Sequence, residues 1–195
     1  METGEVIERF RRTGALLEGH FILTSGLHGT TYLQCALVLQ HPPEAERFGR
    51  ALAERFAGER VETVAAPAIG GIVIGWEVAR ALGARSIWAE REAGRMTLRR
   101  GFTVRPGERV LVAEDVVTTG GSTRETIGAL TGAGAHVVGA ASIVDRSGGR
   151  ADVGVPRVAL ATLDVPSYDP AACPLCAEGV PAVKPGSRKA VTGDG

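Results

Sequence analysis

The run RVLVAEDVVTTGGSTR, residues 109–124, decides the fold of this chain. Its first part, Val110–Ala113, is a short apolar segment of the kind that forms a buried strand. Two adjacent carboxylates, Glu114 and Asp115, follow it, and a loop of small residues then leads into a helix predicted over Thr123–Leu130. A strand, a tight loop and a helix in this order form half of a βαβ unit, which favours an α/β protein.

Short apolar segments alternate with helical patterns from Thr63 onward. The expected strands and helices fall at 63–66, 72–82, 86–89, 110–113, 123–130, 137–144 and 157–165. Strands that alternate with helices are parallel, and apolar runs without polar alternation are typical of strands buried on both faces. The sequence therefore predicts a Rossmann-like, mostly parallel sheet flanked by helices.

The segments on either side of this core have a different pattern. Apolar residues at helical spacing predict a helix over Val6–Leu17, and Pro42-Pro43 opens another. Between them, Phe21–Leu23 and Tyr32–Cys35 form an expected strand pair around a turn-rich segment. From Pro166 the chain is rich in proline, glycine and alanine, so we expect an irregular or docked tail.

Length and composition limit the possible functions. A chain of 195 residues fits one domain with small additions. Its 22 basic residues balance 22 acidic ones, so no overall field attracts nucleic acid or an anionic membrane. No apolar run approaches the ~20 residues that cross a bilayer, and the N-terminus lacks an apolar signal core. With an odd number of cysteines as well, we expect a cytoplasmic protein with neither nucleic-acid nor membrane partners.

The loop after the acidic pair has the chemistry of a phosphate site. Thr118–Thr123 offers hydroxyls and unhindered amides at a helix N-terminus, where Ser122 and Glu125 have capping-box spacing. The carboxylates of Glu114 and Asp115 suit sugar hydroxyls, and they can help to hold Mg²⁺ directly or through water. The pattern predicts a ribose 5-phosphate ligand; the alternative is an ordinary strand-end turn whose glycines only permit tight packing.

Two further segments are candidate anion sites. The strand end before Ile69 and Gly70 also opens into a helix, so its amides can cradle an anion, unless Gly70 is a simple N-cap. A polar loop predicted over Glu90–Gly101 carries arginines at 91, 95, 99 and 100. From composition alone, such a run of charges is usually a solvated surface.

Several residues that often bind metals or stack on bases form no complete pattern. Cys173-Pro-Leu-Cys176 has the spacing of half a zinc site, but no second pair or nearby histidine in the sequence completes four ligands. We therefore expect no metal held by the protein itself. Trp76 and Trp88 are expected in the core or at an interface. The histidines are expected to be structural; they are His20, His28, His41 and His136.

The acidic pair and the loop after it resemble the binding motif for phosphoribosyl pyrophosphate (PRPP) of type I phosphoribosyltransferases. The resemblance implies that family's fold, with a small N-terminal hood (1–40), a PRPP-binding core (60–165) and a C-terminal extension (166–195) in one domain. It also implies a mobile basic loop that closes over the pyrophosphate. The implied PRPP-binding residues are Ile69, Gly70, Arg91, Arg95, Glu114, Asp115, Val116, Val117, Thr118, Thr119, Gly120, Gly121 and Ser122.

The chemistry implied by the resemblance needs cations near the leaving group and no nucleophilic side chain. Departure of pyrophosphate leaves positive charge on the ribose and negative charge on the departing oxygens. Arg91, Arg95 and Asp115 are the implied catalytic residues. Mg²⁺ is expected as the cofactor, held mainly through PRPP and water. A homodimer is expected because the basic loop of this family commonly reaches the neighbouring site.

Over nearly its full length the chain is similar to bacterial orotate phosphoribosyltransferases, which act in de novo pyrimidine biosynthesis. The similarity rests on segments 21–26, 91–102, 109–124, 144–146 and 173–188. It implies that Arg146 and Thr118 bind orotate, with the Tyr32-Leu33 backbone completing the pocket. Thr24 differs from the PRPP-binding lysine of some members.

Two alternatives share the PRPP motif. A purine-base phosphoribosyltransferase needs a pocket for a neutral ring instead of a carboxylate. A PRPP-sensing regulator that binds nucleic acid is disfavoured by the balanced charge and by the lack of an added helix-turn-helix segment.

Overall fold

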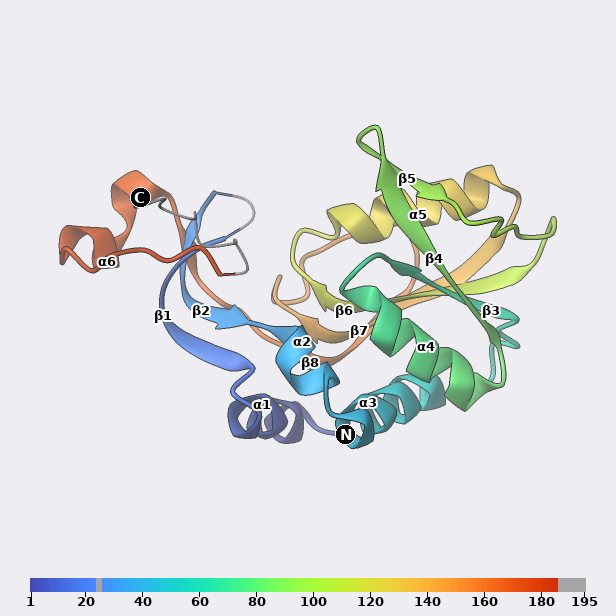
Figure 1. Cartoon of the computed structure of the whole chain (residues 1–195), viewed down its shortest axis with the longest axis horizontal. Coiled ribbons are helices and arrows are strands. Elements are labelled where there is room, and N and C mark those ends of the chain that lie inside the picture. Colours follow the sequence, from blue (N-terminus) through green and yellow to red (C-terminus); the bar gives the residue numbers. More distant parts are fainter. Residues whose placement is uncertain (24–25, 186–195) are drawn as a thin grey trace, which may run out of the picture.

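The computed structural model describes residues 1–23 and 26–185, so Thr24 lies outside the described residues. Its main sheet has six strands in the order β5-β4-β3-β6-β7-β8 (Figure 1). All neighbours are parallel except β4 and β5, which are antiparallel. The strands are β3 (Thr63–Pro67), β4 (Arg85–Glu92), β5 (Arg95–Leu98), β6 (Arg109–Val117), β7 (His136–Asp145) and β8 (Arg157–Thr162). The predicted α/β class and mostly parallel sheet are confirmed.

The central strands are buried on both faces, as their apolar runs predict. Along β6, Leu111 packs with the helices on one side of the sheet, whereas Val110 and Val112 pack with α5 on the other. Side chains alternate between the faces of a strand, so both faces must be apolar here. The helices are α1 (Thr3–Arg12), α2 (Cys35–Leu39), α3 (Pro42–Glu54), α4 (Gly71–Leu82) and α5 (Gly121–Gly132).

A second, small sheet stands to one side of the main sheet (Figure 1). It consists of β1 (Leu16–Ile22), β2 (His28–Leu33) and β9 (Ser167–Tyr168), all antiparallel. The chain after β9 forms η1 (Pro170–Ala172) and α6 (Pro174–Ala177) against it. A bridge between Phe21 and Val183 adds this tail to the sheet edge. The expected docked tail is confirmed for the residues up to 185.

The first helix is shorter than predicted. It ends at Arg12 rather than Leu17, because Gly14 takes a left-handed φ of +68° and turns the chain. Leu16 and Leu17 then begin β1. Their apolar side chains continue the helical spacing by chance, and pairing with β2 decides their structure.

The segment predicted as a polar loop at Glu90–Gly101 is mainly a β-hairpin. Strand β4 continues to Glu92, and Ala93 and Gly94, both with positive φ, form a two-residue turn into β5. Turns of this kind match the twist of the strands they join. The polar composition hid the hairpin because one of its faces is open to solvent.

No helix in the described parts of the chain is both long and apolar enough to span a bilayer.

The close approach of α3 to α4 depends on Gly49. A Cβ added there would lie 2.5 Å from Glu77 Cβ and 2.8 Å from its backbone carbon. We predict that Gly49→Ala lowers the free energy of unfolding by about 1–3 kcal/mol through overpacking. Chemical denaturation measures this change. In the control Gly128→Ala, on an open helix surface, the same substitution should raise stability by about 0.5–1 kcal/mol. Equal effects of the two substitutions would contradict this account of the packing.

Candidate active site

The candidate site lies where β3, β6 and β7 end. These strands are parallel neighbours, so the loops after Pro67, Val117 and Asp145 meet at one edge of the sheet. A cavity of about 640 Å³ opens there, between this edge and the small sheet. It is lined by Leu23, Leu27, Tyr32, Leu33, Val116, Thr118, Thr119, Arg124, Arg146, Ser147, Arg150, Ala151, Asp152, Val165 and Ser167.

Glu114 is buried and tied to the first turn of α5. Its carboxylate accepts a hydrogen bond from Ser122 Oγ at 2.6 Å and another from Thr123 Oγ1. Burial raises the pKa of Glu114, as does the charge of Asp115, while the two hydroxyls act in the opposite direction. Ser122 therefore holds Glu114 in place. The predicted capping box is wrong, because α5 has Gly120 at its N-cap and no side-chain cap.

The Asp115 side chain lies against the loop that precedes α4. Burial raises its pKa, although hydrogen bonds from backbone amides and from the Cys35 thiol lower it in part. A Cβ at Gly70 would lie 2.9 Å from Asp115 Oδ2, so only glycine allows the loop to come this close. The structure thus brings together two segments, around Gly70 and Asp115, that the sequence placed at separate strand ends.

The loop from Thr118 to Gly120 is shaped to present amides. Thr118 and Thr119 are exposed, and Gly120 has a φ of +74° with Val153 Cγ1 only 2.9 Å from where a Cβ would stand. Arg124 fixes the loop by donating to the backbone oxygen of Thr119 at 2.9 Å. Because the first amides of an α-helix have no acceptor within the helix, this bend is suited to an anion.

The loop at Ile69 and Gly70 offers a second group of amides. The peptide between Ala68 and Ile69 is cis, and Gly70 is the N-cap of α4 without a side-chain cap. The Ile69 side chain is 85% exposed. A helix start without its own cap leaves backbone donors for a ligand.

The predicted arginines lie on the hairpin rather than in the cavity lining. Arg91 pairs with Glu125 of α5 at 2.7 Å, and Arg99 and Arg100 pair with carboxylates of the same hairpin. Arg95, at the start of β5, makes no ion pair with any residue in the described ranges. In this conformation the site is open, and the expected contact of Arg91 and Arg95 with PRPP stays a prediction.

Arg146 is held in the cavity wall with unused donors. Its Nη2 donates to the Thr31 oxygen at 3.3 Å, but its buried Nε has no hydrogen-bond partner among the described residues. Burial lowers the pKa of Arg146. The neighbouring Asp145 is fully engaged, since it accepts from Ser147 and Gly149 and pairs with Arg157 at 2.8 Å. Asp145 therefore does not form an ion pair with the neighbouring Arg146.

Sequence reasoning named Tyr32 and Leu33 of the small sheet as pocket residues but missed others that line the cavity. These are Leu23 and Leu27, between β1 and β2, and Ser167 of β9. Burial raises the pKa of the Tyr32 hydroxyl. The sequence signal for this part of the cavity was the presence of apolar residues beside a predicted turn. Apolar side chains on a turn that faces only solvent would stay exposed, so they indicate a binding surface.

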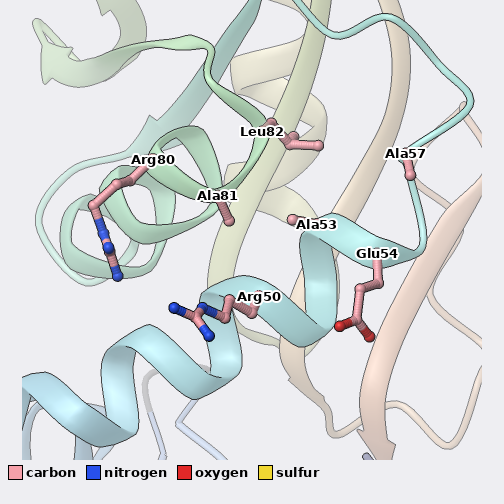
Figure 2. Close-up of a pocket in the computed structure, with 7 residues that line it drawn as sticks. All are labelled: Arg50, Ala53, Glu54, Ala57, Arg80, Ala81 and Leu82. Atoms are coloured by element: carbon pink, nitrogen blue, oxygen red, sulfur yellow. The ribbon is translucent and has the colours of Figure 1, made fainter.

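A second hollow, of about 430 Å³, lies between α3 and α4 (Figure 2). Its arginines, Arg50 and Arg80, are paired with Glu46 and Glu77, so their charge is compensated. It borders Leu82, at the far end of α4 and about 18 Å from the strand-end site by the rise of the helix. This hollow is separate from the candidate active site.

The chain is similar to known phosphoribosyltransferases. Residues 37–161 match the family model described as "Phosphoribosyl transferase domain". The orotate phosphoribosyltransferase of Pelotomaculum thermopropionicum is 58% identical over 189 residues, covering 97% of this chain and all of that protein. The one from Desulforamulus reducens is 54% identical, with 97% and 99% covered. The crystal structure of Mycobacterium tuberculosis orotate phosphoribosyltransferase with PRPP has a TM-score of 0.65 and 27% identity, with 83% and 96% covered.

The raised pKa of Asp115 gives a testable dependence of stability on pH. The folded state binds more protons than the unfolded chain from about pH 3.9 up to the raised pKa, so Asp115 costs stability as pH rises through that range. We predict that Asp115→Asn raises the melting temperature of the ligand-free protein at neutral pH, with a gain that disappears in acid. Thermal unfolding at several pH values measures it.

The control is Asp164→Asn. Arg150 lowers the pKa of Asp164, so this substitution should slightly lower the melting temperature at neutral pH. A wild type that is as stable as Asp115→Asn at neutral pH would show that burial of the carboxylate has no cost.

Proposed function

This chain belongs to the phosphoribosyltransferase family and, within it, to the orotate phosphoribosyltransferases, and from that premise we propose which of its residues carry the reaction. The enzyme transfers the ribose 5-phosphate of PRPP to orotate, giving orotidine 5′-monophosphate and pyrophosphate in pyrimidine biosynthesis. It is a pentosyltransferase with the type I phosphoribosyltransferase fold.

The 5-phosphate of PRPP binds in the bend between β6 and α5. The amides from Thr118 to Ser122 lie at the N-terminus of α5, and Thr118 and Thr119 are exposed, so that their hydroxyls can donate to the same anion. A phosphate dianion at a helix N-terminus gains both hydrogen bonds and the helix dipole. Val116 and Val117 position this bend at the end of β6.

The ribose hydroxyls bind to Glu114 and Asp115. Glu114 already accepts two protein hydroxyls, but an ionised carboxylate has about four acceptor sites, so it can accept a sugar hydroxyl as well. Asp115 lies close to Gly70 and precedes the phosphate bend in the chain, and this position supports its assignment to the ribose between the two phosphate groups of PRPP. The hydroxyls of a sugar bound here also supply hydrogen bonds in place of the water that these two carboxylates lost on folding.

The donor set suits Mg²⁺ held mainly through PRPP and water. The buried carboxylate of Glu114 and the half-buried one of Asp115 offer oxygen ligands beside an anion site, and Mg²⁺ characteristically keeps several waters and few protein ligands. When bound, Mg²⁺ neutralises charge that develops on the pyrophosphate. Glu114 and Asp115 are the residues that would hold its water shell.

The pyrophosphate binds between the amides of Ile69 and Gly70 and the arginines of the hairpin. To reach it, Arg91 must leave Glu125; both side chains are nearly half exposed, so breaking this pair costs at most about 1 kcal/mol. Arg95 already lacks an ion pair among the described residues. Positive charge near the leaving oxygens stabilises the transition state, and closure of the hairpin excludes water.

Orotate binds in the cavity with its carboxylate on Arg146. The buried, unpartnered Nε of Arg146 is the observation that carries this assignment, because a guanidinium with unused donors costs free energy until an anion satisfies it. Thr118 and the backbone of Tyr32 and Leu33 complete the pocket. A neutral purine would leave Arg146 unsatisfied.

We also propose that the enzyme is a homodimer. Ile69, Val73 and Trp76 form an apolar row at the start of α4, and the Trp76 side chain is 58% exposed. Such a row beside the pyrophosphate loop fits an interface that brings a partner's hairpin to the site. We further propose that the hood, core and C-terminal extension work as one domain in the cytoplasm.

The function is tested by Mg²⁺-dependent formation of orotidine 5′-monophosphate from orotate and PRPP. We predict that Arg146→Ala lowers kcat/KM for orotate about a hundredfold, as expected for roughly 3 kcal/mol lost with a charge-assisted pair, while the KM for PRPP changes little. Arg146→Lys should keep part of the activity, since it retains the charge but loses the fork.

The control is Arg50→Ala in the hollow of Figure 2, which should have wild-type kinetics. Turnover of hypoxanthine or adenine without turnover of orotate would instead support a purine-specific enzyme.

The shared site predicts complementation between two inactive variants. Arg95→Ala removes the cation on the hairpin, and Asp115→Asn removes the carboxylate that contacts the sugar. The homodimer of either variant should therefore be nearly inactive. If the hairpin serves the neighbouring subunit, a mixed dimer contains one site with both residues intact. Unfolding and refolding the two variants together should restore partial activity. Mixing without any gain, although light scattering shows dimers, would place Arg95 in its own subunit's site.

A further inference from the structure

Four side chains that the sequence left unconnected meet outside the active site. They are His20 of β1, His28 of β2, Cys173 beside η1 and Cys176 of α6. One potential ligand atom from each lies within 4.8 Å of all the others. The expectation that Cys173 and Cys176 lack partners, and that these histidines form no ligand pattern, is therefore wrong.

The distances within this cluster fit a tetrahedral metal site. His20 Nε2 lies 2.8 Å from His28 Nδ1 and 3.4 Å from Cys173 Sγ. Cys176 Sγ lies 3.7 Å from His20 Nε2 and 3.2 Å from His28 Nδ1. In a tetrahedral Cys₂His₂ zinc site, bonds of about 2.0–2.3 Å set ligand atoms roughly 3.3–3.8 Å apart. The two imidazole nitrogens must separate by about half an ångström to reach this spacing, and the remaining pairs of ligand atoms already lie within 4.8 Å of one another.

The surroundings orient His20 as a ligand. Its Nδ1 lies 2.7 Å from the backbone oxygen of Val180, which requires the proton to be on Nδ1 and leaves the lone pair of Nε2 facing the cluster. Metal-binding histidines almost always donate their second ring nitrogen in this way. The tail also holds the backbone of the same residue, since Val183 N donates to His20 O at 2.9 Å.

Burial and ligand type favour zinc among the possible cations. His20, His28 and Cys173 are buried, and only Cys176 is exposed. Two sulfurs and two imidazoles without a carboxylate suit zinc, whereas Mg²⁺ prefers oxygen. Four protein ligands also leave no open position for a substrate or water. We propose that His20, His28, Cys173 and Cys176 bind one structural zinc ion, which fastens the C-terminal tail to the small sheet.

This zinc site stabilises the β1–β2 hairpin, which forms one wall of the proposed orotate cavity. Leu23, Leu27 and Tyr32, which line that cavity, belong to the same hairpin as the two histidine ligands. The ligands are separated by up to 156 positions in the chain, so one ion closes most of the sequence into a loop. Binding of zinc to the folded state alone stabilises it by mass action.

Metal analysis of the untagged protein, purified under reducing conditions, tests the proposal. We expect one zinc per chain, lost in the double variant Cys173→Ser/Cys176→Ser and retained in the control His136→Ala, whose histidine is exposed on β7. Removing the metal with a chelator should lower the melting temperature of the wild type but not that of the double variant.

Cobalt substitution keeps the test valid if the double variant fails to fold. Co²⁺ added to the metal-free wild type should give the intense visible bands of a tetrahedral site and a thiolate charge-transfer band. Absence of both zinc and these bands in the reduced wild type would overturn the proposal, as would zinc retained by a folded double variant. A Cys173–Cys176 disulfide in the purified wild type, found by mass spectrometry, would replace the metal site with a redox pair.

Discussion

The burial of two adjacent carboxylates at the end of β6 is the constraint on which the site depends. Glu114 and Asp115 lie in β6 itself, directly after its apolar part, so they are carried into a region where ionisation is costly. The surrounding structure offsets part of this cost with hydroxyls from α5 and with a thiol and amides beside Asp115. The remainder makes the site receptive to sugar hydroxyls and a hydrated cation.

The two ends of the site differ in how far they are organised before substrate arrives. The phosphate bend is fixed by Gly120 and Arg124, and Arg146 stands in the cavity wall with unused donors. In contrast, Arg91 is held by Glu125 on the surface of α5. In the proposed mechanism, fixed groups bind PRPP and the base, whereas the arginines assigned to the leaving pyrophosphate must move, so that leaving-group activation is coupled to closure.

Sequence patterns predicted the fold well where a single local rule decides the structure. The apolar run at Val110–Ala113 was predicted as a buried strand and forms the first part of β6, and the acidic pair lies beyond it in the same strand, beside the cavity. Local rules failed where pairing between distant segments decides: Leu16 continued a helical pattern but pairs with Leu33 in a sheet. The capping box failed because the Ser122 hydroxyl turns to donate to the Glu114 carboxylate, and α5 is left without a side-chain cap. His20 and Cys173 lie 153 positions apart, and no spacing rule could connect them.

The pairing of the chain's two ends has a consequence for biosynthesis. Strand β2 finds its second neighbour only in β9, and Ile22 donates its amide to Val183, near the end of the described chain. The six-stranded core is fully synthesised by residue 162, five residues before β9 begins and 21 residues before Val183. During translation, the main sheet can thus fold before the small sheet is complete. A ribosome that stalls between residues 162 and 167 would leave a nascent chain with a finished main sheet but with a small sheet that lacks β9 and the bridge from Phe21 to Val183.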